Sequence, residues 1–386
     1  MSRIESTNPM NDSPEADEDR RLFLEAADRF LERTAGEDTG SGFSPQRWAQ
    51  FAEMGWLGLG LPEELGGFLG LHEAMLLMEK LGAAGLRDPV MDNLILCGHF
   101  LATHGNASQR AVCANMALGK TRLAWAVAET ASRHDWAAVQ TVVDSTTRQL
   151  TGQKCLVSCA QLSQYLLVLA RESNGSGLTL LLVPADRAGT SLRHYVTYDG
   201  RSCSDVTFNQ VELSESDVVG TPGTAHAPVE AAMNAAYVAL ACEAAGAMRS
   251  AYQLTLDYAR TRKQFGKVLT ANQAYQHAMV DLYVAVEEAQ GLAHHASQQL
   301  GMADNLAPDS GALASRWASA AKAFASADGR VVGEQAVQLH GAIGMTEAYA
   351  VGRHYKRLAA IANQYGDADW HLLRIRDLDL ASNRGT

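Results

Sequence analysis

The spacing of hydrophobic and polar residues changes twice along the chain and divides it into three blocks. In residues 20–120 apolar side chains recur every three or four positions, for example over residues 22–31, which predicts amphipathic helices. Residues 121–223 instead contain short apolar runs separated by turn residues, a pattern typical of strands. The helical spacing returns over residues 224–386. We therefore predict an N-terminal helical domain, a middle β domain and a C-terminal helical domain with these boundaries.

Turn residues refine the middle block, and long helices define the last one. Asn174-Gly175 and Asp199-Gly200 favour the tight turns that join antiparallel strands. The predicted fold class is α+β, with an antiparallel middle sheet and a C-terminal four-helix bundle. Strands and helices do not alternate along the sequence, so a doubly wound sheet is not expected. The predicted strands cover residues 140–143, 166–169, 178–183 and 205–213, and the predicted bundle helices cover residues 227–263, 270–301, 308–340 and 345–380.

Length, charge and the N-terminal residues narrow the class of protein. A chain of 386 residues, 47% of them hydrophobic, is long enough for more than one packed core. Its net charge of −11 argues against nucleic acid as a partner, because proteins that bind nucleic acid present a basic surface. We expect no membrane helix, since no segment reaches the roughly 18 consecutive apolar residues that one needs. Residues 1–19 are predicted to form a disordered acidic tail.

The cysteines and histidines predict neither a metal site nor a disulfide framework. Six cysteines are scattered through apolar surroundings without a C-x-x-C pair, which is typical of reduced thiols in a cytoplasmic protein. Cys155 and Cys159 are four residues apart, but no second pair follows to complete a zinc site. We therefore expect a cytoplasmic protein without a structural metal.

Three sequence motifs occur in the order, and in the blocks, of one protein family. The first block contains MGWLGLGLPEELGG at residues 54–67. The first helix of the bundle ends in YARTRKQFGK at residues 258–267, and QLHGAIGMT at residues 338–346 joins the last two helices. On these motifs the chain resembles the acyl-CoA dehydrogenase family over about residues 20–375.

The resemblance implies a quaternary structure, a cofactor and a reaction. Members of this family assemble as a dimer of dimers with FAD at a subunit interface. A carboxylate removes the α-proton of an acyl-CoA thioester while the β-hydrogen leaves as hydride to the flavin, and electron-transfer flavoprotein is the electron acceptor. The residues that would contact the adenine and pyrophosphate of FAD, called the cradle residues below, are Arg262, Phe265, Gln273, Gln338 and Gly341.

The motifs that hold the flavin ring in this family are altered. The family's Thr-Glu-Pro stretch is replaced by Ala128-Glu129-Thr130, and its Gly-Ser-Asp by Arg133-His134-Asp135. Its Trp-Ile-Thr-Asn is replaced by Leu156-Val157-Ser158-Cys159, which keeps a hydroxyl at Ser158 but loses the indole. We expect Ser158 to contact the cofactor and the ring site as a whole to be weakened.

The position of the catalytic carboxylate is altered as well. Comparison with the family's Tyr-Glu-Gly-Thr motif brings the glutamate position to Tyr365, and an alternative position on the first bundle helix is Ala236. Neither side chain is a carboxylate. Glu243, on the same helix face as Ala236, and Asp367, two residues beyond Tyr365, are the carboxylates that could replace it, although a packing or interface role suits Glu243 better.

These losses lead to one hypothesis and three alternatives. Because the cradle is retained while the ring site and the base are eroded, we interpret the chain as the non-catalytic subunit of a heterotetrameric (α2β2) acyl-CoA dehydrogenase with a homologous catalytic partner. The resemblance implies a bulky substrate, the CoA thioester of a steroid side chain or of a dicarboxylic acid. The alternatives are a catalytic homotetramer that uses Glu243 or Asp367, a flavin monooxygenase on the same fold, and a structural or CoA-binding module.

Overall fold

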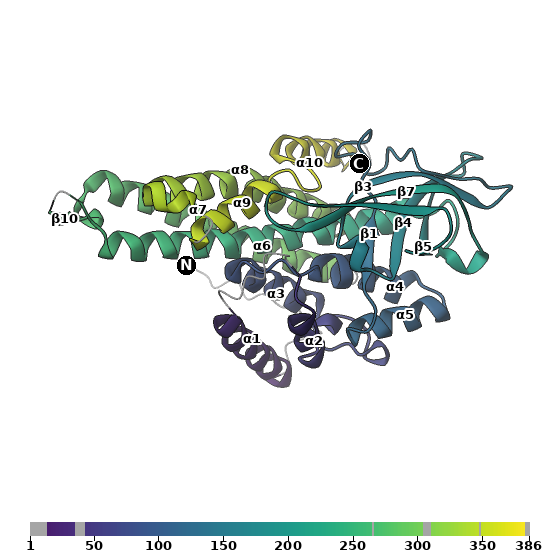
Figure 1. The fold of residues 1–386 in the computed structure, drawn as a ribbon, viewed down its shortest axis with the longest axis horizontal. Coiled ribbons are helices and arrows are strands. Elements are labelled where there is room, and N and C mark those ends of the chain that lie inside the picture. Colours follow the sequence, from purple (N-terminus) through teal and green to yellow (C-terminus); the bar gives the residue numbers. More distant parts are fainter. Residues whose placement is uncertain (1–13, 35–42, 265, 304–309, 347–348, 383–386) are drawn as a thin grey trace.

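The computed structural model describes residues 14–34, 43–264, 266–303, 310–346 and 349–382 and shows a helical region, a sheet and a second helical region in the predicted order (Figure 1). The first helix begins at Pro14, so residues 14–19 are helical and are not part of a disordered tail. Residues 1–13 lie outside the described residues. The N-terminal elements are α1 (Pro14–Thr34), α2 (Pro45–Glu53), η1 (Trp56–Gly58), η2 (Glu63–Leu65), α3 (Leu71–Ala84), η3 (Met91–Gly98), α4 (His99–His104) and α5 (Ala107–Ala117).

Local sequence signals set the ends of these helices. Ser44 caps α2 by accepting a hydrogen bond from the backbone N–H of Arg47 at 3.3 Å. Asn106 and Gln109 form a capping box at the start of α5, in which each side chain accepts the backbone N–H of the other at 3.0 Å. η3 differs from its neighbours because it is a π-helical segment, and all eight of its residues are buried.

The middle region is one eight-stranded sheet, mainly antiparallel as predicted, with β1 and β2 both parallel to β4. The two predicted turns lie at glycines with positive φ, Gly175 between β4 and β5 and Gly200 between β6 and β7. The strand order is β6-β7-β3-β2-β4-β5-β8, with β1 beside β4. The strands are β1 (Leu123–Ala126), β2 (Val142–Val143), β3 (Gln149–Ser158), β4 (Tyr165–Glu172), β5 (Leu178–Pro184), β6 (Thr190–Val196), β7 (Ser202–Glu212) and β8 (Val218–Val219), with short 3₁₀ turns η4 (Ala160–Leu162) and η5 (Glu215–Asp217).

The C-terminal region is a bundle in which the last predicted helix is broken in two. The predicted helix over residues 345–380 stops at Ile361 and resumes at Ala368, because Tyr365 and Gly366 both have positive φ. The bundle elements are α6 (His226–Thr261), α7 (Gln273–Ala303), α8 (Ser310–His340), η7 (Gly341–Met345), α9 (Ala350–Ile361) and α10 (Ala368–Ser382), and the small ribbon β9 (Lys263–Gln264) with β10 (Lys267–Val268) and the turn η6 (Leu269–Ala271) joins α6 to α7.

Helix α6 is the central element of the molecule. Among the described residues it is the one helix long and apolar enough to cross a membrane, but 89% of its most apolar 18-residue window is buried inside the protein, as in a core helix. Close contact with α3 requires glycine on both helices. A Cβ added at Gly82 would lie 2.0 Å from the Glu243 carbonyl oxygen, and one at Gly246 would lie 1.9 Å from that of Glu79. These glycines fix the N-terminal helices against the bundle.

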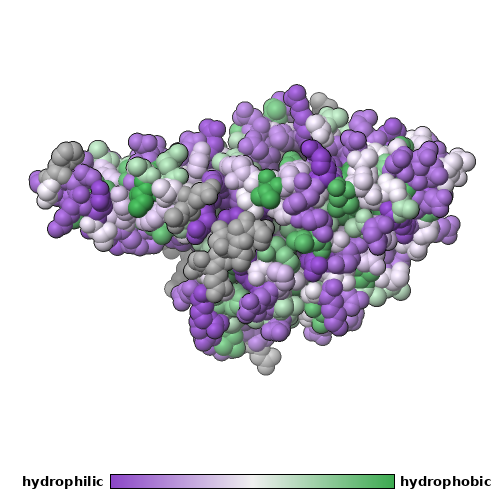
Figure 2. Space-filling view, in the orientation of Figure 1, coloured by the Kyte–Doolittle hydropathy of each residue, from purple (hydrophilic) through white to green (hydrophobic). Residues whose placement is uncertain are grey.

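The sheet and the loop between α6 and α7 lie at opposite ends of the molecule. Figure 1 shows the strands at one end of the long axis and β10 at the other, with the bundle helices spanning the distance between them. On the face in Figure 2 the surface is mainly hydrophilic, with hydrophobic residues in small separate groups. This arrangement determines which functional residues one chain can bring together.

Candidate functional site

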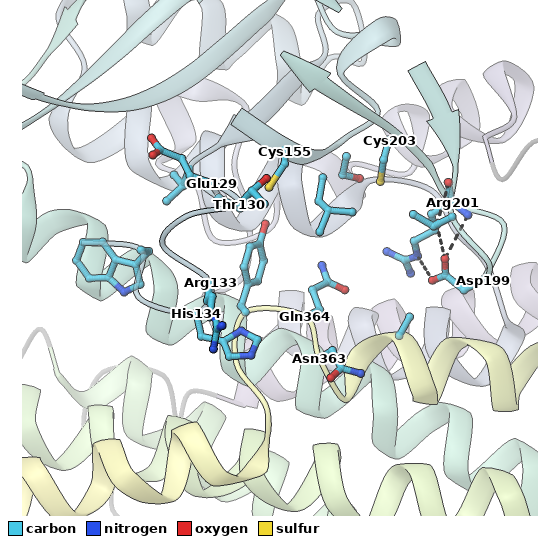
Figure 3. A pocket seen from close by; sticks show the side chains of 18 of the residues that line it. Glu129, Thr130, Arg133, His134, Cys155, Asp199, Arg201, Cys203, Asn363 and Gln364 are labelled. Carbon is cyan, nitrogen blue, oxygen red and sulfur yellow. Dashed lines mark hydrogen bonds and ion pairs between the residues drawn. The ribbon is translucent and has the colours of Figure 1, made fainter. Parts of the chain in front are cut away.

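A cavity of about 690 Å³ lies where the sheet meets the bundle. Asn363 and Gln364 lie on the wall opposite Cys155 and Cys203, and Asp199 and Arg201 close one side (Figure 3). The lining comes from the loop after β1 within residues 127–136, from β3 within residues 155–158, from the β6–β7 hairpin within residues 197–205, from Met233 of α6, and from α9 and the turn after it within residues 357–365.

Glu129 is a cavity-lining carboxylate that is fully engaged by other groups. Its carboxylate accepts hydrogen bonds from the buried Lys154 ammonium at 2.6 Å and from the backbone N–H groups of Gln140 and Thr141 at 2.7 and 3.1 Å. Burial raises the pKa of Glu129, but the Lys154 charge and the hydrogen bonds outweigh burial and hold this pKa below its ordinary value. Glu129 is therefore a structural anion and a poor proton acceptor.

Two further carboxylates line the cavity, and each is likewise paired with a cation. Asp199 accepts a hydrogen bond from Arg357 at 3.1 Å, and Asp205 accepts one from the Tyr195 hydroxyl at 2.8 Å and pairs with Arg193. Burial raises the pKa of both, yet in each case the partners outweigh burial and the net pKa is lowered. Among the described residues, no carboxylate that lines the cavity is without a cationic partner.

Three non-glycine residues around the cavity have backbone in the left-handed region. Arg133, Leu156 and Tyr365 have φ of 50°, 54° and 56°, and they are three of the seven non-glycine residues with positive φ in the described chain. Such conformations cost of order 1–3 kcal/mol each and cluster at functional sites. All three lie in segments where the sequence departs from the flavin-ring and base motifs described above, so these altered segments form part of the cavity wall.

Tyr365, at the predicted base position, lies on the turn between α9 and α10 and lines the cavity. Burial raises the pKa of its phenol well above the ordinary value, so the hydroxyl keeps its proton at neutral pH. Lys322, a fully buried residue of α8, stabilises this turn. Its ammonium donates to the Ile361 and Gly366 carbonyls at 2.9 and 2.8 Å and to the Ser326 hydroxyl at 2.7 Å.

The two carboxylates considered as replacement bases have other roles. Glu243 does not line the cavity; it is buried and accepts hydrogen bonds from Arg357 at 2.7 Å and from Arg201. Burial raises its pKa, but the two guanidinium groups outweigh burial and lower it. Asp367 caps α10 by accepting the Trp370 N–H at 2.9 Å, and it faces His134 at 3.7 Å. Ala236 is buried within α6.

The structure separates the predicted cofactor residues into two groups. Ser158 lines the cavity. Arg262, Gln273, Gln338 and Gly341 are exposed at the opposite end of the bundle, around the loop that carries β10, and Phe265 lies outside the described residues (Figure 1). At about 1.5 Å of rise per residue, Arg262 lies roughly 44 Å along α6 from the cavity-lining Met233. One chain cannot bring its own cradle to its own cavity.

One further residue, Asp92, belongs to none of the motifs found in the sequence. It lies on η3 and is 1% exposed, and neither carboxyl oxygen has a hydrogen-bond partner among the described residues. Burial raises its pKa. In the sequence it is a single aspartate within an apolar helical run, a pattern that does not distinguish a buried carboxyl from one on a solvated face. Within the described ranges, no cluster of three or more His, Cys, Asp or Glu residues could hold a metal ion.

The fold and its segments match one family over most of the chain. Models of the acyl-CoA dehydrogenase N-terminal, middle and C-terminal domains match residues 17–119, 124–211 and 227–377. The chain belongs to the acyl-CoA dehydrogenase family, whose members are FAD-dependent oxidoreductases acting on a CH–CH bond.

Individual relatives are distant in sequence but match nearly full length. FadE12 of Mycobacterium tuberculosis, an acyl-CoA dehydrogenase, is 29% identical over 82% of this chain and 83% of its own. A 3-(aryl)acrylate reductase of Clostridium sporogenes is 26% identical over 94% and 97%. Among solved structures, the Tcur3481-Tcur3483 steroid ACAD is 27% identical with a TM-score of 0.83 and covers 96% of this chain and 99% of that one. PigA with FAD and proline has a TM-score of 0.86, covering 98% and 100%, but at 20% identity it shows the fold alone.

Proposed function

We propose that this chain is the partner subunit of a heteromeric acyl-CoA dehydrogenase, in which it completes the FAD site of a homologous catalytic chain. This proposal rests on the pairing of the carboxylates that line the cavity. Glu129, Asp199 and Asp205 are each held by a cation, and the usual base position carries a neutral phenol at Tyr365. Removal of an α-proton needs a free carboxylate near the reacting carbon, so that base comes from the partner.

The cradle residues fit the part of FAD that they would hold. The Arg262 guanidinium, exposed beyond the end of α6, can donate two hydrogen bonds to a pyrophosphate, and Gln273 and Gln338 add amide donors on neighbouring helices. Gly341 has positive φ, and a Cβ there would meet no atom within 4 Å, so its backbone is open to a ligand. Bound FAD supplies the hydride acceptor for the β-carbon of the thioester.

The partners and substrate proposed follow from the family and its neighbours. The Tcur3481-Tcur3483 steroid ACAD, whose name joins two designations and which is 27% identical to this chain, supports a heteromeric assembly. As the substrate we favour the CoA thioester of a steroid side chain over that of a dicarboxylic acid. A neighbour described as an electron-transferring flavoprotein and a relative described as a subunit of a reductase–Etf complex support electron-transfer flavoprotein as the acceptor. We place this assembly in the cytoplasm.

The test is to purify the chain from its native source and identify the chain that accompanies it, then to co-express the two. In that pair we expect Arg262→Gln to lower the FAD content at least several-fold, because a charge-assisted pyrophosphate contact is lost. Arg260→Gln is the matched control, since Arg260 is two residues away, is also exposed and is paired with Asp257 at 3.7 Å. FAD content is read from the visible absorbance per mole of protein.

Two outcomes would refute the proposal. One is a native homo-oligomer of this chain that oxidises an acyl-CoA, which would restore the catalytic homotetramer. The other is equal FAD content in the Arg262 and Arg260 variants of the pair, which would show that the cradle is not used. Oxygen consumption by a reduced-flavin form of the chain would instead identify a monooxygenase.

A further inference from the structure

Three arginines line the cavity, and one of them is left without an anionic partner. Arg201 donates to Glu243, and Arg357 donates to Glu243 at 2.7 Å and to Asp199 at 3.1 Å. The third, Arg133, is exposed and makes no hydrogen bond or ion pair through its side chain among the described residues. Because the carboxylates of the cavity wall are already paired, the wall carries one positive charge that none of them neutralises.

The backbone at Arg133 is strained as well. Its φ of 50° lies in the left-handed region, which side chains other than glycine rarely adopt. The family's Gly-Ser-Asp stretch reads Arg133-His134-Asp135 here, so an arginine stands where a glycine would be free of strain. Strained residues of this kind cluster at ligand sites, and here the strained residue is also the unpaired cation.

The amide of Gln364 presents a second donor to the same cavity. Its Oε1 accepts a hydrogen bond from the Arg357 guanidinium at 3.1 Å. Since arginine has donors only, the amide oxygen must face Arg357, and the NH₂ group is turned away from it. That NH₂ group has no hydrogen-bond partner among the described residues, and Figure 3 shows the Gln364 side chain pointing into the cavity. Arg357 therefore orients Gln364 as a donor to a ligand.

Much of the remaining wall is apolar and open. Leu156 and Tyr198 line the cavity, yet 59% and 57% of these residues are exposed. Trp136 and Met233 add further apolar surface. A ligand with an apolar body would remove these side chains from water, and a cavity of about 690 Å³ has the size of a small-molecule site.

We propose that this cavity binds an amphipathic carboxylate, with the carboxylate paired to Arg133, the Gln364 amide as a second donor, and the apolar body against Leu156 and Tyr198. A carboxylate has one charge and two oxygens, which match the one charge and the two parallel donors of a guanidinium. A phosphate monoester carries up to two charges, and among the described lining residues Arg133 is the arginine that remains to meet them. Neither Arg133 nor Gln364 belongs to the cradle, so this inference stands apart from the proposed partner role.

Three probes with the same alkyl chain and different head groups test the ligand class. Octanoate, 1-octanol and octyl phosphate are titrated into the full chain alone and followed by ligand-observed NMR. The wild type should bind octanoate about 3- to 10-fold more tightly than 1-octanol, the contribution of an ion pair at a partly exposed site. Without the cation this order should reverse, because a carboxylate loses more hydration than a hydroxyl.

Two glycine substitutions separate the ligand role of Arg133 from its effect on folding. Arg133→Gly removes the guanidinium and relieves the left-handed strain, so the thermal midpoint should stay the same or rise while the octanoate preference is lost. Arg148→Gly is the matched control, because Arg148 also has positive φ, at 58°, but lies between β2 and β3 and does not line the cavity. It should change the midpoint in the same direction and keep the preference.

Gln364→Glu tests the second donor. It keeps an oxygen for Arg357 but replaces the NH₂ group with a carboxylate oxygen, so the octanoate preference should be lost without a fall in the thermal midpoint.

Several results would overturn the inference. An octanoate preference that survives in Arg133→Gly, or that is lost equally in Arg148→Gly, would exclude Arg133 as the partner of the carboxylate, and one that survives in Gln364→Glu would exclude Gln364. Tighter binding of octyl phosphate than of octanoate would identify a phosphate ligand instead, and failure of all three probes to bind would exclude an amphipathic anion. The partner role is decided separately, by the FAD content of the Arg262 variant, which these titrations do not measure.

Discussion

Glu243, considered in the sequence as a replacement base, is held in the fold by a buried ion pair with Arg357. The pair connects α6 to α9, and Arg201 joins it from the β6–β7 hairpin, so that one buried carboxylate links all three segments. Such a pair adds little net stability compared with apolar packing, but breaking it leaves an unpaired buried charge. Its role is to fix the hairpin, which forms one wall of the cavity, relative to the bundle.

We expect Glu243→Gln to lower the free energy of unfolding by roughly 3–5 kcal/mol, because both guanidinium groups lose their shared carboxylate. Urea unfolding followed by circular dichroism measures this. The control is Glu287→Gln, which breaks the exposed pair with Arg249 at 2.9 Å and should cost less than about 1 kcal/mol. A Glu243→Gln protein as stable as the control, but without dehydrogenation in an active homo-oligomer, would make Glu243 the base after all.

The turn between α9 and α10 is the element that most distinguishes this cavity. Gly366 has φ of 116°, and a Cβ there would lie 2.7 Å from the Trp370 ring and 2.8 Å from the His371 ring. Lys322 holds the same turn through two carbonyls. The turn therefore depends on one glycine and one buried lysine, and each can be tested.

Gly366→Ala should destabilise the protein by roughly 1–3 kcal/mol, since it combines backbone strain with overlap against two rings. Gly291→Ala is the opposite case, because Gly291 lies in α7 and a Cβ there meets nothing within 4 Å. That change should stabilise by roughly 0.5–1 kcal/mol. Equal effects of the two substitutions on the thermal midpoint would show that the turn is not constrained.

Lys322 makes the stability of this turn depend on pH. Burial lowers the pKa of Lys322 from 10.5 to about 7, so between these values the unfolded chain binds more protons than the folded one, and stability rises with pH. The contribution approaches about 1.4 kcal/mol per pH unit. Urea unfolding at pH 7, 8 and 9 should give a steeper rise for the wild type than for Lys322→Met. Parallel curves would mean that the buried lysine titrates normally.

At the same scale, the sequence predicted the regular elements and missed those set by tertiary contacts. The block order and the turns at Gly175 and Gly200 follow from periodicity and turn chemistry. Strands β1, β3, β6 and β8 lie outside the predicted strand ranges: β3 contains register shifts around Gly152 and Lys154, β6 is largely polar, and β8 has two residues. The break at Tyr365 could not be predicted, since a tyrosine with positive φ has no local signal and the turn around it is held by Lys322 through the Ile361 and Gly366 carbonyls.

At the scale of the whole molecule, the cavity and the predicted cradle residues lie at opposite ends. The cavity lies where the sheet meets the bundle, and the cradle lies around the loop beyond α6 and α8, roughly 44 Å away along α6. The cradle residues were predicted from sequence motifs, but their distance from the cavity can be known only from the folded structure. The carboxylate pairing and Asp92 were not predictable, because both depend on which charges the fold brings together.

The most direct test of the proposed partner role is the visible spectrum of the full chain expressed and purified alone. We expect less than stoichiometric FAD and no bleaching of the flavin band when an acyl-CoA is added, because the described cavity has no free carboxylate to remove the α-proton. Stoichiometric FAD that bleaches on addition of an acyl-CoA would contradict it and identify the chain as a complete dehydrogenase.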